Sequence, residues 1–350
     1  MMTGPSQAPL PDVAAAQPPA PGTRPGERVP LDAASRRVLD VMAASGRRPL
    51  EEGTAEDARA LAPARIALNG DGPAMADVQN LTVPADDGHP VPVRVFVPEQ
   101  APRGIAVYLH GGAWIVGSIA ESDTLARRLA AGSGYVVVAV DYRLAPEHTY
   151  PAAVHDTDAV VRWAAQQREA HGLGAEAPLV LIGDSAGGNL ATVAARRARD
   201  RGGPAIALQV LVYPVTNADT ATGSYVDPDN QLLVTRNAMV WAWDRYVPDV
   251  AMRRLPDVSP LLADDLSGMP PAVLLAARYD PMYDEGLAYA RRLRDAGVEV
   301  DHLEHPDQMH GFFTMLTLPA SAVAIDQVVA ALDRLGSGRV RDLAAETTSS

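Results

Sequence analysis

Residues 179–190 read Leu-Val-Leu-Ile-Gly-Asp-Ser-Ala-Gly-Gly-Asn-Leu, in which four apolar residues lead into a serine between glycines. The pentapeptide Gly183–Gly187 thus follows an apolar strand directly and precedes a helical pattern that begins near Gly188. In this strand–turn–helix context, Gly-x-Ser-x-Gly forms a tight, strained turn that raises the serine Oγ above the sheet. Ser185 is therefore the candidate nucleophile. The alternative is a glycine-rich helix start with an N-cap serine.

Apolar runs and amphipathic stretches alternate through most of the chain on both sides of this turn. The expected strands are 105–109, 135–140, 179–182, 208–212, 272–276 and 298–303, and the expected helices are 121–131, 152–169, 187–201, 284–296 and 320–335. Strands that are apolar throughout and alternate with helices indicate an α/β fold, with a mostly parallel central sheet and helices on both faces. Ahead of them, a β-like run at 78–83 and the alternating valines of 91–97 predict a leading antiparallel hairpin.

Composition divides the chain into a core, a cap and two tails. Residues 216–266 form an insertion that is too long for a connection and too apolar for a free loop, so we expect a packed helical cap there. The expected organisation is a disordered Pro- and Ala-rich tail at 1–30, N-terminal cap helices at 31–65, the α/β core at 75–215 and 267–336, the cap insertion at 216–266 and a frayed tail at 337–350.

Composition also excludes several classes of function. With 47% hydrophobic and 21% charged residues, the 350-residue chain is globular. A formal net charge of −13 without a basic patch argues against nucleic acid and anionic membrane surfaces as partners. No apolar run approaches the ~20 residues of a membrane span, and no secretion signal is recognisable, so we expect a cytoplasmic protein. The absence of cysteine excludes disulfides, thiolate metal sites and a cysteine nucleophile.

A serine nucleophile needs a base that takes its proton and a carboxylate that orients the base. Enzymes built on this turn carry the three groups in the chain order Ser, Asp or Glu, His. Asp280 and His310 supply that order, and each follows an expected strand at the same edge of the sheet as the turn. Asp284 and Glu285 are alternative acids, although both fit the first turn of a helix, where carboxylates are favoured.

Two further histidines, His302 and His305, lie close to His310 in the sequence. Their spacing does not match the helical zinc motif H-E-x-x-H, so we expect no metal. We place both histidines at a solvent-facing strand end.

The segment His110-Gly-Gly-Ala-Trp114 directly follows the expected strand 105–109 and suits the binding of a negatively charged oxygen. Small residues leave successive backbone N–H groups free to face a substrate, and such amides stabilise the tetrahedral intermediate of acyl transfer. A plain glycine turn after a strand is the alternative. The candidate oxyanion-hole amides are those of Ala186 and of two residues among Gly111, Gly112 and Ala113, and the sequence leaves open which two.

These motifs resemble the hormone-sensitive-lipase-like family of α/β-hydrolases, the bacterial group IV carboxylesterases, over residues 75–335. The resemblance is carried by His110-Gly-Gly-Ala-Trp114, Asp141-Tyr-Arg-Leu-Ala-Pro-Glu-His148, Tyr150-Pro-Ala152, Gly183-Asp-Ser-Ala-Gly-Gly-Asn189, Ser259-Pro-Leu261, Asp280-Pro-Met-Tyr-Asp-Glu-Gly286 and His310-Gly-Phe312. It implies an α/β-hydrolase fold with a helical cap, and Ser185, Asp280 and His310 as the triad. The chain departs from the family at Ala113, where a third glycine is usual.

The resemblance also suggests roles for neighbouring residues. It implies that His110 organises its loop, and that Tyr142, Arg143 and Glu147 form a hydrogen-bonded network that positions the loops. The candidates to line the acyl or alcohol pocket, with ordinary cap packing as the alternative for each, are Trp114, Met239, Trp241 and Trp243.

The sequence therefore predicts a serine carboxylesterase that acts on small uncharged acyl esters without a cofactor. An acyltransferase or lactone-forming enzyme on the same triad is one alternative, because only the nucleophile that reaches the acyl-enzyme differs. A non-catalytic ligand-binding protein on a hydrolase scaffold is another, although such a protein has no need of all three triad residues. The natural substrate, the acyl chain length and the oligomeric state stay open, a homodimer included.

Overall fold

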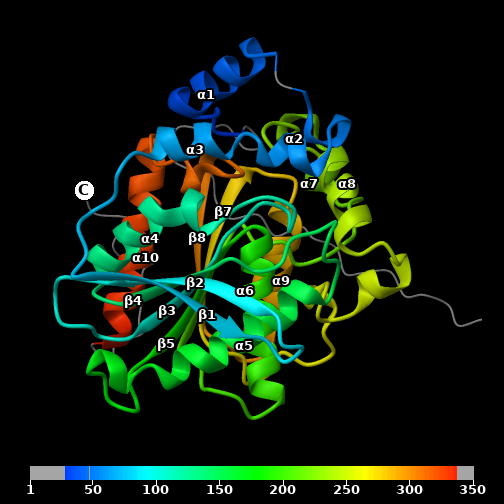
Figure 1. Ribbon diagram of the computed structural model, residues 1–350. Helices are drawn as coiled ribbons and strands as arrows, with labels where there is room; N and C mark the ends of the chain where they lie inside the picture. The colour runs from blue at the N-terminus through cyan, green and yellow to red at the C-terminus, as the bar shows by residue number, and fades with distance from the viewer. Residues whose placement is uncertain (1–27, 47, 337–350) are drawn as a thin grey trace, which may run out of the picture. The chain divides into compact units, whose positions relative to one another are not determined.

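The structure is a computed structural model that describes residues 28–46 and 48–336. The described residues form an eight-stranded sheet in the order β1-β2-β4-β3-β5-β6-β7-β8 (Figure 1). Strands β1 and β2 and strands β2 and β4 pair antiparallel, and all other neighbours pair parallel, which confirms the leading hairpin and the mostly parallel sheet. The strands are β1 (Asp77–Pro84), β2 (Pro90–Val97), β3 (Ile105–Leu109), β4 (Val136–Val140), β5 (Leu179–Asp184), β6 (Leu208–Val212), β7 (Ala272–Tyr279) and β8 (Val300–Met309).

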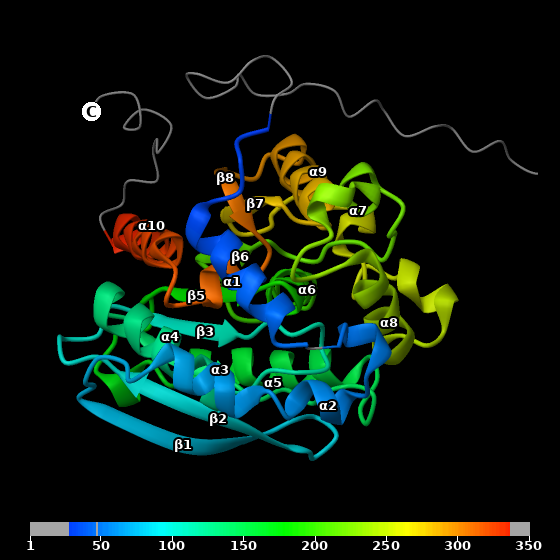
Figure 2. The same cartoon turned by 90° about the horizontal axis from the view of Figure 1, so that it is seen from above.

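Each face of the sheet has its own apolar core, because successive residues of a strand point to opposite sides. In β3, Val107 and Leu109 pack into one core, and Ala106 and Tyr108 pack into the other. The first core is covered by α5 (Ala152–Gln166), α6 (Ala186–Asp200) and α9 (Tyr283–Asp295). The second is covered by α4 (Ile119–Ser133) and α10 (Pro319–Gly336), which lie side by side in Figure 2.

Short helices gather at one end of the strands (Figure 1). Before the sheet come α1 (Ala33–Ala44), α2 (Ala55–Arg59) and α3 (Ala62–Asn69), and between β6 and β7 come α7 (Gly223–Val226) and α8 (Arg236–Tyr246). Both expected cap segments are therefore helical, the first running four residues beyond the expected end. Of the expected tail at 1–30, residues 1–27 lie outside the described residues, as does the whole expected tail at 337–350. Single 3-10 turns are η1 (Leu50–Glu52), η2 (Glu169–His171), η3 (Pro228–Asn230), η4 (Val250–Arg254), η5 (Pro260–Leu262) and η6 (Phe312–Thr314).

Strand register brings the chemically important loops together. Gly183 of β5 pairs with Leu109 of β3, and Asp184 pairs with Val212 of β6. The turn after β5 therefore lies between the loops that follow β3 and β6.

At the other side of the sheet, Tyr279 of β7 pairs with Met309 of β8. The next residue of each strand, Asp280 and His310, consequently leaves the sheet at the same level.

Strand β8 is longer than expected, because it begins at Val300 and continues through Pro306 to Met309. Proline and polar residues are compatible with this strand because β8 stands at an edge of the sheet. The expectation that His305 faces solvent is wrong, because this side chain is buried. Its Nε2 atom lies 3.0 Å from Gln327 Oε1, and its ring packs on Phe312. His302 is half-buried, and burial lowers its pKa.

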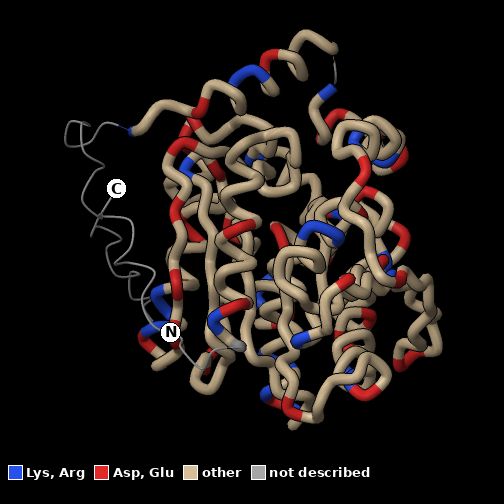
Figure 3. The backbone as a smooth tube through the Cα atoms, turned by 90° about the vertical axis from the view of Figure 1, so that its left-hand side faces the viewer, with Lys and Arg blue, Asp and Glu red and all other residues tan. Residues whose placement is uncertain are grey.

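Charged residues of both signs are interspersed along the elements visible in Figure 3. No continuous basic stripe runs along the elements visible in this view (Figure 3). Among the described residues, no helix combines the length and the apolar character that crossing a membrane requires.

Candidate active site

The turn between β5 and α6 holds Ser185 in a conformation that a helix or strand cannot provide. Its backbone has φ of 54° and ψ of −117°, and its N–H donates to the Val212 carbonyl at 2.9 Å. The flanking glycines permit the turn, because a Cβ on Gly187 would lie 1.9 Å from the Leu109 carbonyl oxygen and one on Gly183 would lie 2.2 Å from the Gly187 oxygen. The strained backbone persists because both of its polar groups are bonded: β6 accepts the N–H, and the Ser185 carbonyl accepts the Val215 and Asn189 amides at 3.2 and 3.1 Å.

One imidazole bridges the serine and a carboxylate. His310 Nε2 lies 2.9 Å from Ser185 Oγ, and His310 Nδ1 lies 2.8 Å from Asp280 Oδ2. Asp280 and His310 are almost fully buried, and Ser185 is 6% exposed. The second oxygen of Asp280 accepts the Met282 N–H at 2.8 Å, which fixes the carboxylate with one oxygen toward the imidazole. The structure thus brings together the three residues that the sequence analysis selected.

The two alternative acids point to other partners. Asp284 Oδ2 accepts the Ser224 N–H of α7 at 2.7 Å, and Glu285 Oε1 accepts the Thr216 N–H at 2.7 Å. Burial raises the pKa of Glu285 well above its usual range. Both carboxyl groups therefore join α9 to the cap insertion, and of the three candidate acids Asp280 is the one that contacts His310.

Backbone amides near Ser185 are available to a negatively charged oxygen. Gly111 is the exception, because its N–H donates to Asp184 Oδ1 at 3.0 Å. The amides of Gly112, Ala113 and Ala186 have no acceptor within the part of the chain that the structure describes. The structure thereby separates Gly111 from the other candidate amides.

His110 contributes to the shape of this loop. Its Nδ1 lies 2.7 Å from the Gly111 carbonyl oxygen, and its ring stacks on Tyr142 with centroids 4.4 Å apart. The Tyr142 hydroxyl donates to the His110 carbonyl at 2.6 Å. These contacts agree with a loop-organising residue.

The expected network of Tyr142, Arg143 and Glu147 is not a single network. Arg143 pairs with Asp156 at 2.6 Å and with Asp87 at 2.8 Å. Glu147 instead pairs with Arg59 of α2, at 2.7 Å. The prediction was wrong because each long side chain reaches a different element.

Two residues near the candidate triad were not predicted from the sequence. Tyr213 follows β6 and lies against His310, with ring centroids 4.4 Å apart. Asp184 is buried beside Ser185 and accepts the Tyr108 hydroxyl at 2.6 Å as well as the Gly111 amide. Burial raises the pKa of Asp184, and the hydrogen bond from Tyr108 opposes that rise. The only sequence signal for Asp184 is its place next to the serine.

The four candidate pocket residues share one apolar cluster. Trp114 of the loop after β3 stacks on Tyr246 of α8, with centroids 4.3 Å apart, and touches Trp243 at 4.7 Å. Trp241 carries the Arg245 guanidinium 3.9 Å above its ring. The indole N–H groups of Trp114, Trp241 and Trp243 are buried without a partner in the described part of the chain. Met239 is buried in the same cluster.

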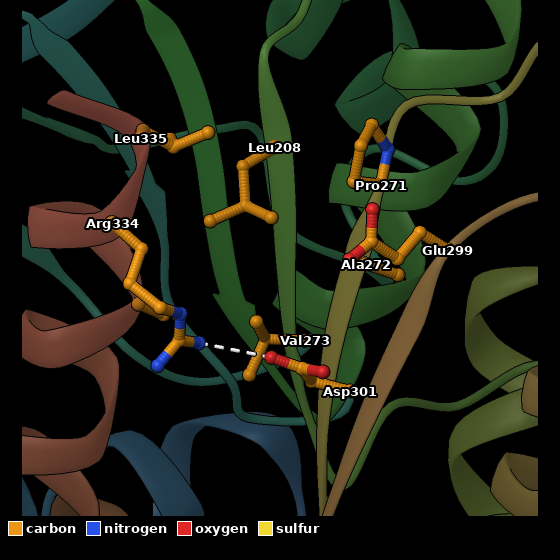
Figure 4. Close-up of a pocket in the computed structure, with 9 residues that line it drawn as sticks. Leu208, Pro271, Ala272, Val273, Glu299, Asp301, Arg334 and Leu335 are labelled. Carbon is orange, nitrogen blue, oxygen red and sulfur yellow. Dashed lines mark hydrogen bonds and ion pairs between the residues drawn. The ribbon is translucent and has the colours of Figure 1, made fainter. Parts of the chain in front are cut away.

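Figure 4 shows a pocket at the opposite end of the sheet, around the first residues of β6 and β7. Its volume is about 10 Å³, which is room for about one water molecule. Arg334 and Asp301 form an ion pair at 2.9 Å across it. This pocket is too small for a substrate. Within the described residues, no group of three His, Asp or Glu side chains is arranged to hold a metal ion.

A serine on a strained strand–helix turn, an imidazole between that serine and a buried carboxylate, and a parallel sheet with helices on both faces together define an α/β-hydrolase. The family model described as alpha/beta hydrolase fold matches residues 106–314. The chain belongs to this family.

Several relatives with curated names are ester hydrolases. Carboxylesterase NlhH of Mycobacterium tuberculosis is 38% identical over 265 residues, which cover 73% of this chain and 82% of the relative. Ethyl acetate hydrolase of Pseudomonas putida is 40% identical over 243 residues, which cover 68% and 76%. The hyperthermophilic esterase of Pyrobaculum calidifontis superposes with a TM-score of 0.82 at 34% identity, covering 88% of this chain and 99% of that one. By this homology the chain is a carboxylic ester hydrolase, and the resemblance stated from its motifs is confirmed.

Proposed function

We propose that the protein is a serine carboxylesterase that hydrolyses small uncharged acyl esters through an acyl-enzyme. The observation that carries this proposal is the position of the His310 ring, with Nε2 2.9 Å from Ser185 Oγ and Nδ1 2.8 Å from Asp280 Oδ2. Hydrogen-bond contact on both sides of one imidazole is what general-base activation of a serine requires.

In the proposed reaction, Ser185 Oγ attacks the ester carbonyl while His310 Nε2 takes the hydroxyl proton. The C=O electron pair moves onto oxygen, and its return expels the alkoxide, which receives the proton from His310. Water then repeats the sequence on the acyl-enzyme and releases the acid. The Asp280 carboxylate stabilises the imidazolium that forms twice in each cycle.

We assign the oxyanion hole to the amides of Gly112, Ala113 and Ala186. Gly111 is left out because Asp184 already accepts its N–H. The turn beyond the hole is supported by the Gly112 carbonyl, which accepts the Ile115 and Val116 amides at 3.0 Å each. Preorganised donors of this kind stabilise the developing charge by several kcal/mol.

Small uncharged esters are proposed because of the surroundings of Ser185 and because of one relative. The cluster beside the oxyanion loop is aromatic, with Trp114, Trp243 and Tyr246 buried together. A hydrolase named for ethyl acetate is 40% identical to this chain. The cytoplasmic location expected from the sequence stays a prediction.

The test of this proposal is a series of p-nitrophenyl esters, from acetate through butyrate, hexanoate and octanoate to laurate. We expect kcat/KM to be greatest for the shorter members, with one acid released per ester consumed. The same reactions with added butanol distinguish transfer from hydrolysis. Butyl ester formed in excess of free acid at low butanol would favour the acyltransferase alternative, because an alcohol would then outcompete water for the acyl-enzyme.

The cap tryptophans are expected to set the preference within this series. If Trp241 or Trp243 lines the acyl pocket, its truncation to alanine opens space, and each extra methylene of the acyl chain gains up to ~0.8 kcal/mol. The ratio of kcat/KM for octanoate and butyrate then rises. If the side chain only packs in the core, its loss costs ~3–5 kcal/mol of stability and lowers the apparent kcat/KM for all substrates alike. The measurement is that ratio, which cancels losses of folded enzyme.

Trp163→Ala is the matched control for these variants, since Trp163 lies on α5 and is partly buried in the same core. Its ratio should equal that of the wild type. An unchanged ratio in both cap variants would remove Trp241 and Trp243 from the pocket.

A further inference from the structure

One guanidinium of α2 reaches three groups on two different loops of the core. Arg59 donates from Nε to the Ile115 carbonyl at 2.8 Å and from Nη2 to the Ala145 carbonyl at 2.8 Å. Its Nη1 and Nη2 also meet the two oxygens of Glu147, at 2.7 and 2.8 Å. A planar guanidinium can make such a set of contacts at once, because its N–H groups point in fixed, divergent directions.

The two loops that Arg59 joins are themselves in contact. Ala145 donates its N–H to the Trp114 carbonyl at 2.8 Å, so residues 145–147 lie against the loop that follows β3. Within that loop, the Gly112 carbonyl accepts the Ile115 amide. The N–H of Ala113 belongs to the same rigid peptide plane as that carbonyl and points the opposite way. Whatever holds Ile115 therefore also orients the Ala113 amide.

The loop that follows β3 has an unfavourable backbone conformation, which contacts from other elements must stabilise. Ala113 has φ of 54° and Trp114 has φ of 60°, in the left-handed region that residues with a Cβ rarely occupy. Gly112, at φ of 119°, precedes them. The strained conformation of Ala113 and Trp114 persists only where surrounding contacts fix it, and Arg59 makes the contact at the far end of this loop.

We propose that Arg59 is a positioning residue for ester hydrolysis: its guanidinium holds the Ile115 carbonyl and thereby keeps the Ala113 amide aimed at the substrate oxygen. The N-terminal helices thus contribute to the chemical step through one side chain, besides covering the core. This inference rests on the proposed function, since it assigns a role in the same oxyanion hole.

Glu147, the carboxylate partner of Arg59, keeps its charge over a wide pH range, so the ion pair between the two side chains stays in place. The hydrogen bonds from Arg59 lower the pKa of Glu147 from 4.5 to about 2. The ion pair is therefore intact above the ordinary pKa and is lost only as the pH falls through the lowered value. Between pH 5 and 9, substitution of Arg59 should lower kcat by a constant factor and leave the shape of the pH profile unchanged.

The test compares Arg59→Gln and Arg59→Lys with the control Arg65→Gln. Arg65 lies on α3 and pairs with Glu121 of α4, so it also ties the N-terminal helices to the core, without contact to either loop. With p-nitrophenyl butyrate, we expect Arg59→Gln to lower kcat about tenfold to hundredfold at nearly constant KM. This is less than the loss of kcat expected when an oxyanion-hole donor is removed altogether. Lysine should restore only part, because one ammonium cannot reach both carbonyls. Arg65→Gln should keep the wild-type kcat.

A second readout isolates the oxyanion. An alkyl trifluoromethyl ketone adds Ser185 Oγ to its carbonyl carbon, places the electron pair on the ketone oxygen and leaves the proton on His310. Its affinity should fall in Arg59→Gln by the same factor as kcat. Reactive sites are counted in each sample with a p-nitrophenyl phosphonate, so that unfolded enzyme does not lower kcat. If the glutamine variant does not fold, the lysine variant decides by the same two measurements.

The outcomes separate the two proposals. Wild-type enzyme that neither hydrolyses the esters nor is trapped at Ser185 would overturn the proposed function. The role of Arg59 alone would be overturned by a different result. In that case the wild-type enzyme hydrolyses the esters and is trapped at Ser185, but kcat and ketone affinity in Arg59→Gln and Arg59→Lys stay within twofold of the wild type. An equal loss in Arg65→Gln would also overturn it, because general loosening of the N-terminal helices would then be the cause.

Discussion

Ser185→Ala is expected to lower kcat for p-nitrophenyl butyrate by about 10⁴-fold or more, because the acyl-enzyme can no longer form. The folded structure should change little. The substitution removes one oxygen whose contact is His310 Nε2, and alanine keeps the Cβ that already fits the turn. Residual hydrolysis in the variant then reflects the remaining oxyanion donors and substrate binding.

The matched control for this variant is Ser133→Ala. Ser133 is also buried, and its Oγ donates to the Leu129 carbonyl of α4 at 2.6 Å and accepts the Tyr135 N–H at 3.2 Å. This variant should keep kcat, which shows that loss of a buried hydroxyl is harmless in itself. The two measurements are kcat per folded enzyme and the thermal midpoint by circular dichroism. Esterase activity above about a tenth of wild type in Ser185→Ala would remove this serine from the nucleophile role.

Asp280→Asn is expected to lower kcat by about 10⁴-fold while preserving the fold. The asparagine oxygen can still accept the Met282 N–H, which leaves the amide NH₂ toward His310 Nδ1. Nδ1 must then act as an acceptor, and the imidazole proton moves to Nε2. A protonated Nε2 cannot take the Ser185 proton, so the base is lost although every heavy atom stays in place.

Asp284→Asn is the control for the acid, because it makes the same chemical change one helical turn away. Asparagine Oδ1 can replace the oxygen that accepts the Ser224 N–H, so this variant should keep kcat within a few-fold. The measurement is kcat of both variants at neutral pH. The reverse ranking would assign the acid to Asp284.

The sequence predicted the fold, and it selected three residues that the structure places in hydrogen-bond contact, because both depend on local patterns. Apolar strands alternating with helices imply the parallel sheet, and the glycines around Ser185 imply a turn that only small residues can form. The order of Asp280 and His310 after their strands then follows from the rule that carboxyl ends of parallel strands share an edge. Register made their contact specific, through the pairing of Tyr279 with Met309.

The features that the sequence missed depend on contacts between distant side chains. Arg59 and Glu147 are 88 positions apart, and Gly111 and Asp184 are 73 apart, so no periodicity links them. The end of β8 was missed for another reason: its polar residues and Pro306 do not resemble a buried strand. An edge position relaxes that requirement, since one side of the strand needs no hydrogen-bonded neighbour.

The close approach of Gly187 to the Leu109 carbonyl has a consequence for how such a protein can diversify. Ser185 and the loop that starts at His110 rise from adjacent strands, whose separation of about 4.8 Å is fixed by backbone hydrogen bonding. The base of the catalytic geometry is thus a property of the peptide backbone and is nearly independent of side-chain identity in the cap. Evolution, or a protein engineer, can therefore change the side chains of the cap while the spacing between Ser185 and the loop that starts at His110 stays the same.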